Sequence, residues 1–170
     1  SLSDDLQVDP MQISPAYAYS TAPAQEHSPG GRQTRALCST AFADVVTQWN
    51  LLALEAIRGA NTPPPAAARH LAILHAAIYD AVNGIAGTHK PYLVSTPAPP
   101  GASMEAAALA AARGVLSSLY PDNRAAYDAE YGRSLQALPE DAGRAAGVSW
   151  GESVARALLE ARRDDGSANQ

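Results

Sequence analysis

The fold is decided by residues 62–84, TPPPAAARHLAILHAAIYDAVNG, a stretch with the marks of a helix at both ends. Thr62 is a candidate N-cap, and Pro63 and Pro64 suit the first turn, where a missing N–H costs nothing. Gly84 offers a left-handed stop. Apolar residues share one face at helical spacing, together with a histidine: Leu71, Leu74, His75, Ile78, Val82 and Ile85. Alanines make the flanks apolar too, which predicts a helix in the middle of a bundle.

Four more helices are predicted around this one. The first runs from Thr34 or Ser39 to Arg58 and ends at Gly59, and the link to the next helix is short enough to make the two antiparallel neighbours. The others are predicted at 103–119, with Ser103 as N-cap, then after Pro121, and then at about 140–163, opened by Pro139.

The segment 86–102, AGTHKPYLVSTPAPPGA, is too rich in proline and glycine for a regular helix. We predict a surface excursion, held to the core by the side chains of Tyr92, Leu93 and Val94. Residues 1–33 lack periodicity and predict an irregular N-terminal arm, either disordered or lying across the bundle or a partner subunit. Residues 34–166 then form the bundle, and 167–170 a frayed end.

Composition supports an all-α helical bundle of about five helices. The chain has 170 residues, of which 46% are apolar and only 6% aromatic, and its many alanines allow close helix packing. The net charge of −5, without a Lys/Arg cluster, argues against nucleic acid and anionic membrane surfaces as partners. Charged residues and histidines interrupt every long apolar run, so no membrane span is expected. Cys38, the only cysteine, excludes an internal disulfide.

Small residues recur every fourth position on the last predicted helix. Gly143, Gly147, Gly151 and Ala155 share one face. Because glycine inside a helix costs about 1 kcal/mol relative to alanine, this repetition indicates that another backbone comes close to that face.

The histidines do not form a recognisable site. His75 lies within an apolar face, and we expect it to be buried with one hydrogen-bond partner and Tyr79 nearby. His70 is five residues away, which does not match a helical zinc pair. No Glu-x-x-His pair of the bundle di-iron type occurs. His27 and His89 fall in predicted loops and are expected to be solvated.

The acids and nucleophiles have structural interpretations. Asp80 and Glu55 are expected to pair with Arg58 or Arg69, or to lie on a polar face, rather than to act in acid–base catalysis. The remaining acids of the bundle are interpreted as solvated faces and caps: Asp122, Asp128, Glu130, Glu140 and Asp141. No G-x-S-x-G, GxGxxG or phosphate-loop motif occurs. We therefore assign no catalytic, cofactor-binding or metal-binding residue.

The stretch from Ala43 to Ile85 resembles the N-terminal helical region of bacterial vanadium-dependent haloperoxidase-like proteins, of the phosphatidic acid phosphatase type 2 superfamily. The likeness covers roughly residues 40–166. It is carried by Trp49-Asn50, Ala56-Ile57-Arg58, the prolines before Ala67-Ala68-Arg69, His75 to Val82, Tyr120-Pro121, the Gly-x-x-x-Ala helix and Arg163-Asp164-Asp165-Gly166.

The resemblance implies an all-helical, secreted or periplasmic enzyme whose pocket binds vanadate or phosphate. With vanadate the family oxidises halides with hydrogen peroxide, and relatives with an empty pocket hydrolyse phosphate esters. The family's pocket motifs, Lys…Arg-Pro, Pro-Ser-Gly-His and Ser-Arg-x-x-x-Gly-x-His, do not occur here. We therefore expect a scaffold half that binds no vanadate alone. Its partner is the C-terminal half of the same protein, possibly a separate chain, docked on the small-residue face of the last helix; a homodimer is also possible.

Two other classes of function stay open. One is a stand-alone helical interaction module without chemistry. The other is a ligand-carrier bundle in which Trp49, His75 and Tyr79 line a cavity.

Overall fold

The protein is all-helical in the part of the chain that its computed structural model describes, residues 34–167, with side chains described from Val45 onward. The helices are α1 (Thr34–Gly59), α2 (Pro64–Ala86), α3 (Met104–Leu119), the 3₁₀ turn η1 (Pro121–Asn123), α4 (Arg124–Gln136) and α5 (Ala142–Ala161). These residues contain no strand, and the all-α prediction is confirmed. The predictions for the arm, for His27 and for the Cys38 side chain fall outside the described part.

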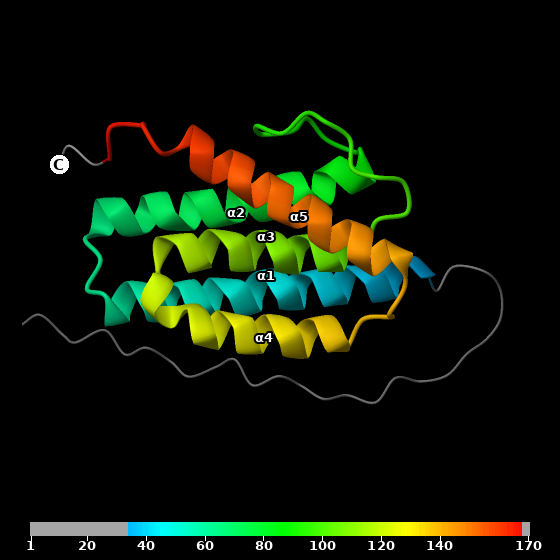
Figure 1. The fold of residues 1–170 in the computed structure, drawn as a ribbon, viewed down its shortest axis with the longest axis horizontal. Helices are drawn as coiled ribbons and strands as arrows, with labels where there is room; N and C mark the ends of the chain where they lie inside the picture. Colours follow the sequence, from blue (N-terminus) through cyan, green and yellow to red (C-terminus); the bar gives the residue numbers. More distant parts are fainter. Residues whose placement is uncertain (1–33, 168–170) are drawn as a thin grey trace, which may run out of the picture. The chain divides into compact units, whose positions relative to one another are not determined.

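Helix α3 occupies the centre of the bundle, with α1, α2 and α4 running alongside it and α5 crossing it obliquely (Figure 1). Its six alanines between 106 and 112 and the intervening Leu109 are all buried. Because alanine side chains are short, neighbouring helices can come close on every side. The prediction that α2 is the central helix is therefore wrong: α2 has an outer face, on which Tyr79 is 41% exposed.

Both predicted ends of α2 differ from the observed ones. Thr62 makes no cap, because its Oγ1 lies 3.2 Å from the hydroxyl of Tyr120, and the helix starts after Pro63. It ends at Ala86, and its left-handed cap, with a φ of 62°, is Gly87, three residues after the expected Gly84. Gly84 stays helical, and a Cβ there would come within 2.5 Å of the Trp150 ring. The absence of that Cβ makes room for the indole.

The caps of α3 and α5 are side chains. The Ser103 hydroxyl accepts from the N–H of Ala106 at 3.2 Å, as predicted. Asp141 caps α5 by accepting from the N–H of Arg144 at 2.8 Å. Helix α5 therefore begins after Asp141 rather than at Pro139, since the carboxylate satisfies a first-turn N–H.

The small-residue face of α5 is closed by the chain itself. A Cβ on Gly147 would lie 2.4 Å from the carbonyl oxygen of Ser103, and one on Gly151 would lie 2.2 Å from that of Ala107. The predicted close backbone approach is confirmed. Its partner is α3 with the residues leading into it, so the expectation that this face is open for another polypeptide is wrong.

Candidate functional site

His75 connects α2 to α1. Its Nε2 lies 3.1 Å from Oδ1 of Asn50, and the side chain is half-buried. The expected single hydrogen-bond partner is confirmed, although burial is only partial. Tyr79, four residues further along α2, donates its hydroxyl to the carbonyl oxygen of Lys90 at 2.7 Å.

His70 makes a separate contact with the end of α3. Its Nδ1 lies 2.8 Å from the hydroxyl of Tyr120, and the two rings meet edge to face with centroids 5.3 Å apart. Burial, and secondly the charge of Arg69, lower the pKa of His70 below its ordinary value of 6.5. The two histidines thus serve different helix contacts and share no site.

Asp80 organises the loop after α2. Its carboxylate is 1% exposed and accepts three consecutive backbone N–H groups: that of Tyr92 at 2.6 Å, that of Leu93 at 2.8 Å and that of Val94 at 2.9 Å. The expected ion pair with Arg69 is absent. A buried carboxylate must be compensated, and here backbone donors do so in place of a cation.

Asn83 adds a second fastening one turn later. Its side-chain amide donates to the carbonyl oxygen of His89 at 2.8 Å and accepts from the same residue's N–H at 2.9 Å. The side chains predicted to hold the loop do so only in part. Val94 packs against the core, and the hydroxyl of Tyr92 accepts from the guanidinium of Arg162, although Tyr92 is 54% exposed; Leu93 is 45% exposed. The loop is therefore held mainly through its backbone.

Arg69 holds the segment that follows α5. Its Nε lies 2.9 Å from Oδ2 of Asp165, and its Nη2 donates to the carbonyl oxygen of Arg162 at 2.6 Å. Hydrogen bonds, the first from Arg69, lower the pKa of Asp165 from 3.8 to about 2. Arg69 therefore pairs with neither Asp80 nor Glu55. Glu55 is exposed, which agrees with the alternative prediction of a carboxylate on a polar face.

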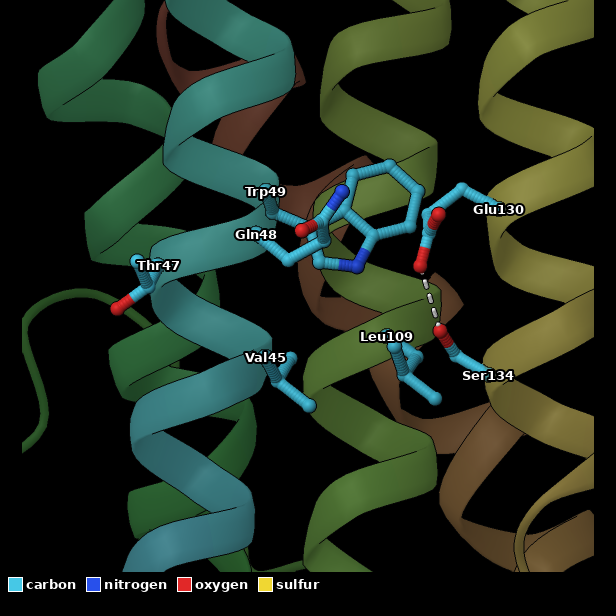
Figure 2. A pocket seen from close by; sticks show the side chains of 7 residues that line it. All are labelled: Val45, Thr47, Gln48, Trp49, Leu109, Glu130 and Ser134. Carbon is cyan, nitrogen blue, oxygen red and sulfur yellow. Dashed lines mark hydrogen bonds between the residues drawn. The ribbon is translucent and has the colours of Figure 1, made fainter. Parts of the chain in front are cut away.

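A cleft lies between α1 and α4, with a volume of about 340 Å³ (Figure 2). Described residues that line it are Val45, Thr47, Gln48 and Trp49 of α1, Leu109 of α3, and Glu130 and Ser134 of α4. Glu130, predicted to be solvated, is only 5% exposed. Its carboxylate accepts from the hydroxyl of Ser134 at 2.8 Å and from the guanidinium of Arg133. These bonds offset the cost of its burial.

Two buried polar atoms at this interface have no hydrogen-bond partner, Nε1 of Trp49 and the hydroxyl of Tyr127. The two rings pack at a tilt, with centroids 6.2 Å apart. Burial first, then Tyr120 and Glu55, raise the pKa of Tyr127 to about 12, so its hydroxyl stays protonated. Of the three residues predicted to line a cavity together, only Trp49 lines this cleft. No sequence signal marks the cleft, because it depends on the spacing of α1 and α4 over α3.

The described residues do not fit a vanadate or phosphate pocket. Such a pocket needs several cations converging on one point beside a histidine. Lys90 is exposed on the loop, and Arg69 is committed to Asp165. A second cleft, beside α2 and the end of α5, is lined by Arg69, Arg162 and Arg163. Arg162 donates to the hydroxyl of Tyr92, and Arg163 pairs with the carboxylates of Glu160 and Asp164.

Neither a metal cluster nor a membrane span is found in the part of the chain that the structure describes. No three His, Cys, Asp or Glu side chains from Val45 onward are grouped to hold a metal ion. No helix in the same range is both long and apolar enough to cross a bilayer. No protein-family model, curated protein or solved structure matches the chain.

Proposed function

We propose that this chain is the helical scaffold of a vanadium-dependent haloperoxidase-like or acid-phosphatase-like enzyme, secreted or periplasmic. The vanadate or phosphate pocket is supplied by residues that this chain does not contain. The enzyme then oxidises halides with hydrogen peroxide, or hydrolyses phosphate esters. This chain positions the pocket-bearing helices and contributes no reacting group.

The observation that carries the proposal is the role of the residues that resemble the family. Asn50 and His75 lie in two such stretches and bond to each other at 3.1 Å, joining α1 to α2. Arg69 and Asp165 come from two others, 96 residues apart, and bond at 2.9 Å. Asp80 fastens the loop after α2. Such long-range polar contacts between elements are what a scaffold requires.

The proposal is tested by supplying the missing pocket. The coding sequence after Gln170 is read for Lys…Arg-Pro, Pro-Ser-Gly-His and Ser-Arg-x-x-x-Gly-x-His. A polypeptide with these motifs is then co-expressed with this chain. We expect a stable complex that shows vanadate-dependent bromide oxidation or hydrolyses p-nitrophenyl phosphate, while this chain alone does neither. A complex without activity, or turnover by the 170-residue chain alone, would refute the proposal.

A second candidate function is a self-contained helical binding module. It is favoured by the closure of the α5 glycine face within the chain, which leaves that face no need of a partner. A small-molecule cleft between α1 and α4 is compatible with this role. The two functions are separated by the same co-expression experiment, because a binding module forms no active complex with a motif-bearing polypeptide.

A further inference from the structure

The cleft between α1 and α4 contains a buried donor that nothing in the described chain satisfies. Trp49 is 0% exposed, and its indole N–H has no hydrogen-bond partner. A polar group removed from water without a partner costs free energy, so such groups in folded proteins are usually paired. Trp49 is also among the residues that line the cleft, so its indole forms part of the cleft wall.

The opposite wall of the cleft supplies an acceptor. The carboxylate of Glu130 is buried and receives bonds from Ser134 and Arg133. An ionised carboxylate has about four lone-pair sites, so it can accept a further hydrogen bond. Figure 2 shows the indole of Trp49 next to the side chain of Glu130 at the cleft, with the indole nitrogen on one edge of the ring. The remaining surface includes the apolar side chains of Val45 and Leu109.

We propose that this cleft binds a small neutral molecule that carries a hydroxyl group on an apolar body, with phenol as the simplest representative. A hydroxyl can accept from the Trp49 N–H and donate to the Glu130 carboxylate at the same time. An ammonium group has no lone pair to offer Trp49, and a ligand carboxylate is repelled by Glu130. The volume of about 340 Å³ lies within the range of small-molecule sites.

The inference does not depend on the proposed function, since the cleft lies within this chain and uses none of the residues that carry the family resemblance except Trp49. Its main competitor is water, which has the same donor and acceptor capacity but no apolar body. A hydroxylic ligand is favoured over water by the apolar side chains, because burying them against the ligand releases water from both surfaces.

The test is a titration of the full chain with phenol, followed by the two indole N–H signals in ¹H–¹⁵N spectra. Trp150 is an internal control, because its N–H already donates to the carbonyl oxygen of Ala81 at 2.9 Å. We expect a saturable shift of the Trp49 signal only, with signals assigned from Trp150→Phe. Toluene, which keeps the ring and lacks the hydroxyl, is expected to bind roughly tenfold more weakly or worse.

A matched substitution tests the acceptor. Glu130→Gln keeps the size of the side chain and removes its charge, and phenol should then bind roughly tenfold more weakly. The comparison of phenol with toluene uses the unaltered chain and stands even if this variant does not fold. The inference is overturned if the Trp49 signal does not move at high phenol, which would mean a site for water only. Equal binding of toluene, or parallel shifts of both indoles, would overturn it as well.

Discussion

Replacing Asp80 by alanine should release the loop after α2 while leaving the helices packed. The substitution removes acceptors for three backbone N–H groups, at 2.6, 2.8 and 2.9 Å. A hydrogen bond to a charged group contributes about 1.5–3 kcal/mol, so loss of all three without compensation would cost at least about 4.5 kcal/mol. The loop borders solvent, with Tyr92 half exposed, so water can replace part of the loss. We expect a decrease of about 2–4 kcal/mol in the free energy of unfolding.

Two measurements check this prediction. Urea unfolding gives the change in the free energy of unfolding. The expected change is a large fraction of the roughly 5–15 kcal/mol by which a typical domain is stable. Amide hydrogen exchange reports on the loop directly, since the N–H groups of Tyr92, Leu93 and Val94 should lose their protection.

The matched control is Asp122→Ala, which removes an exposed carboxylate from η1 and should change stability by no more than about 0.5 kcal/mol. If Asp80→Ala behaves like this control, or if residues 92–94 keep their protection, the carboxylate does not hold the loop and the reasoning fails.

Three further predictions concern packing and pH. Gly151→Ala should lower the free energy of unfolding in urea by about 1–3 kcal/mol, because the added Cβ would meet a backbone carbonyl. Gly132→Ala, at an open position of α4, should be neutral or stabilising by up to about 1 kcal/mol, and similar values for both variants would contradict the close approach of α5 to α3. Asp165 has a folded pKa of about 2 against 3.8 unfolded, so its contribution is complete above about pH 4 and is lost as the pH falls toward 2. The urea midpoint of Asp165→Asn should fall less steeply with decreasing pH over that range than the midpoint of the wild type. Identical slopes would show that Arg69 does not stabilise the carboxylate. His70 should titrate by NMR with a pKa below 6.5, because the folded state disfavours the imidazolium. Its protonation should therefore reduce the stability of the fold as the pH falls below 6.5, and a titration midpoint above 6.5 would mean that the imidazolium is stabilised.

The helices could be predicted from the sequence because their apolar spacing is a local property. The bounds of α1, and of α3 with its Ser103 cap, agree with the prediction. The end of α2 does not agree with the prediction, because a glycine such as Gly84 can have either of two structural roles that the sequence does not distinguish. A glycine can stop a helix or admit a neighbour, and here the ring of Trp150, 66 positions away, takes the space.

The polar contacts were less predictable because their partners are distant or are backbone atoms. The donors to Asp80 are backbone N–H groups 12 to 14 residues further along the chain, in a loop without periodicity. No pattern of charged residues in the sequence predicts these bonds. Glu130 lies on a helix with a polar sequence and was expected in water. Its burial follows from the position of α4 beside α3 and α1, which is a tertiary property.

The anchoring of the 87–102 loop has a consequence for how its sequence can change. Asp80 and Asn83 bind main-chain atoms of the loop, so the exposed side chain of Leu93 can be exchanged without loss of these bonds. The side chain of Tyr92 has a contact of its own, because its hydroxyl accepts from the guanidinium of Arg162. Proline is unsuitable at 92, 93 or 94, because it lacks the N–H that donates to the Asp80 carboxylate, and the side chain at 94 must also pack against the core. The backbone shape of the loop can therefore persist while an outward side chain such as that of Leu93 changes.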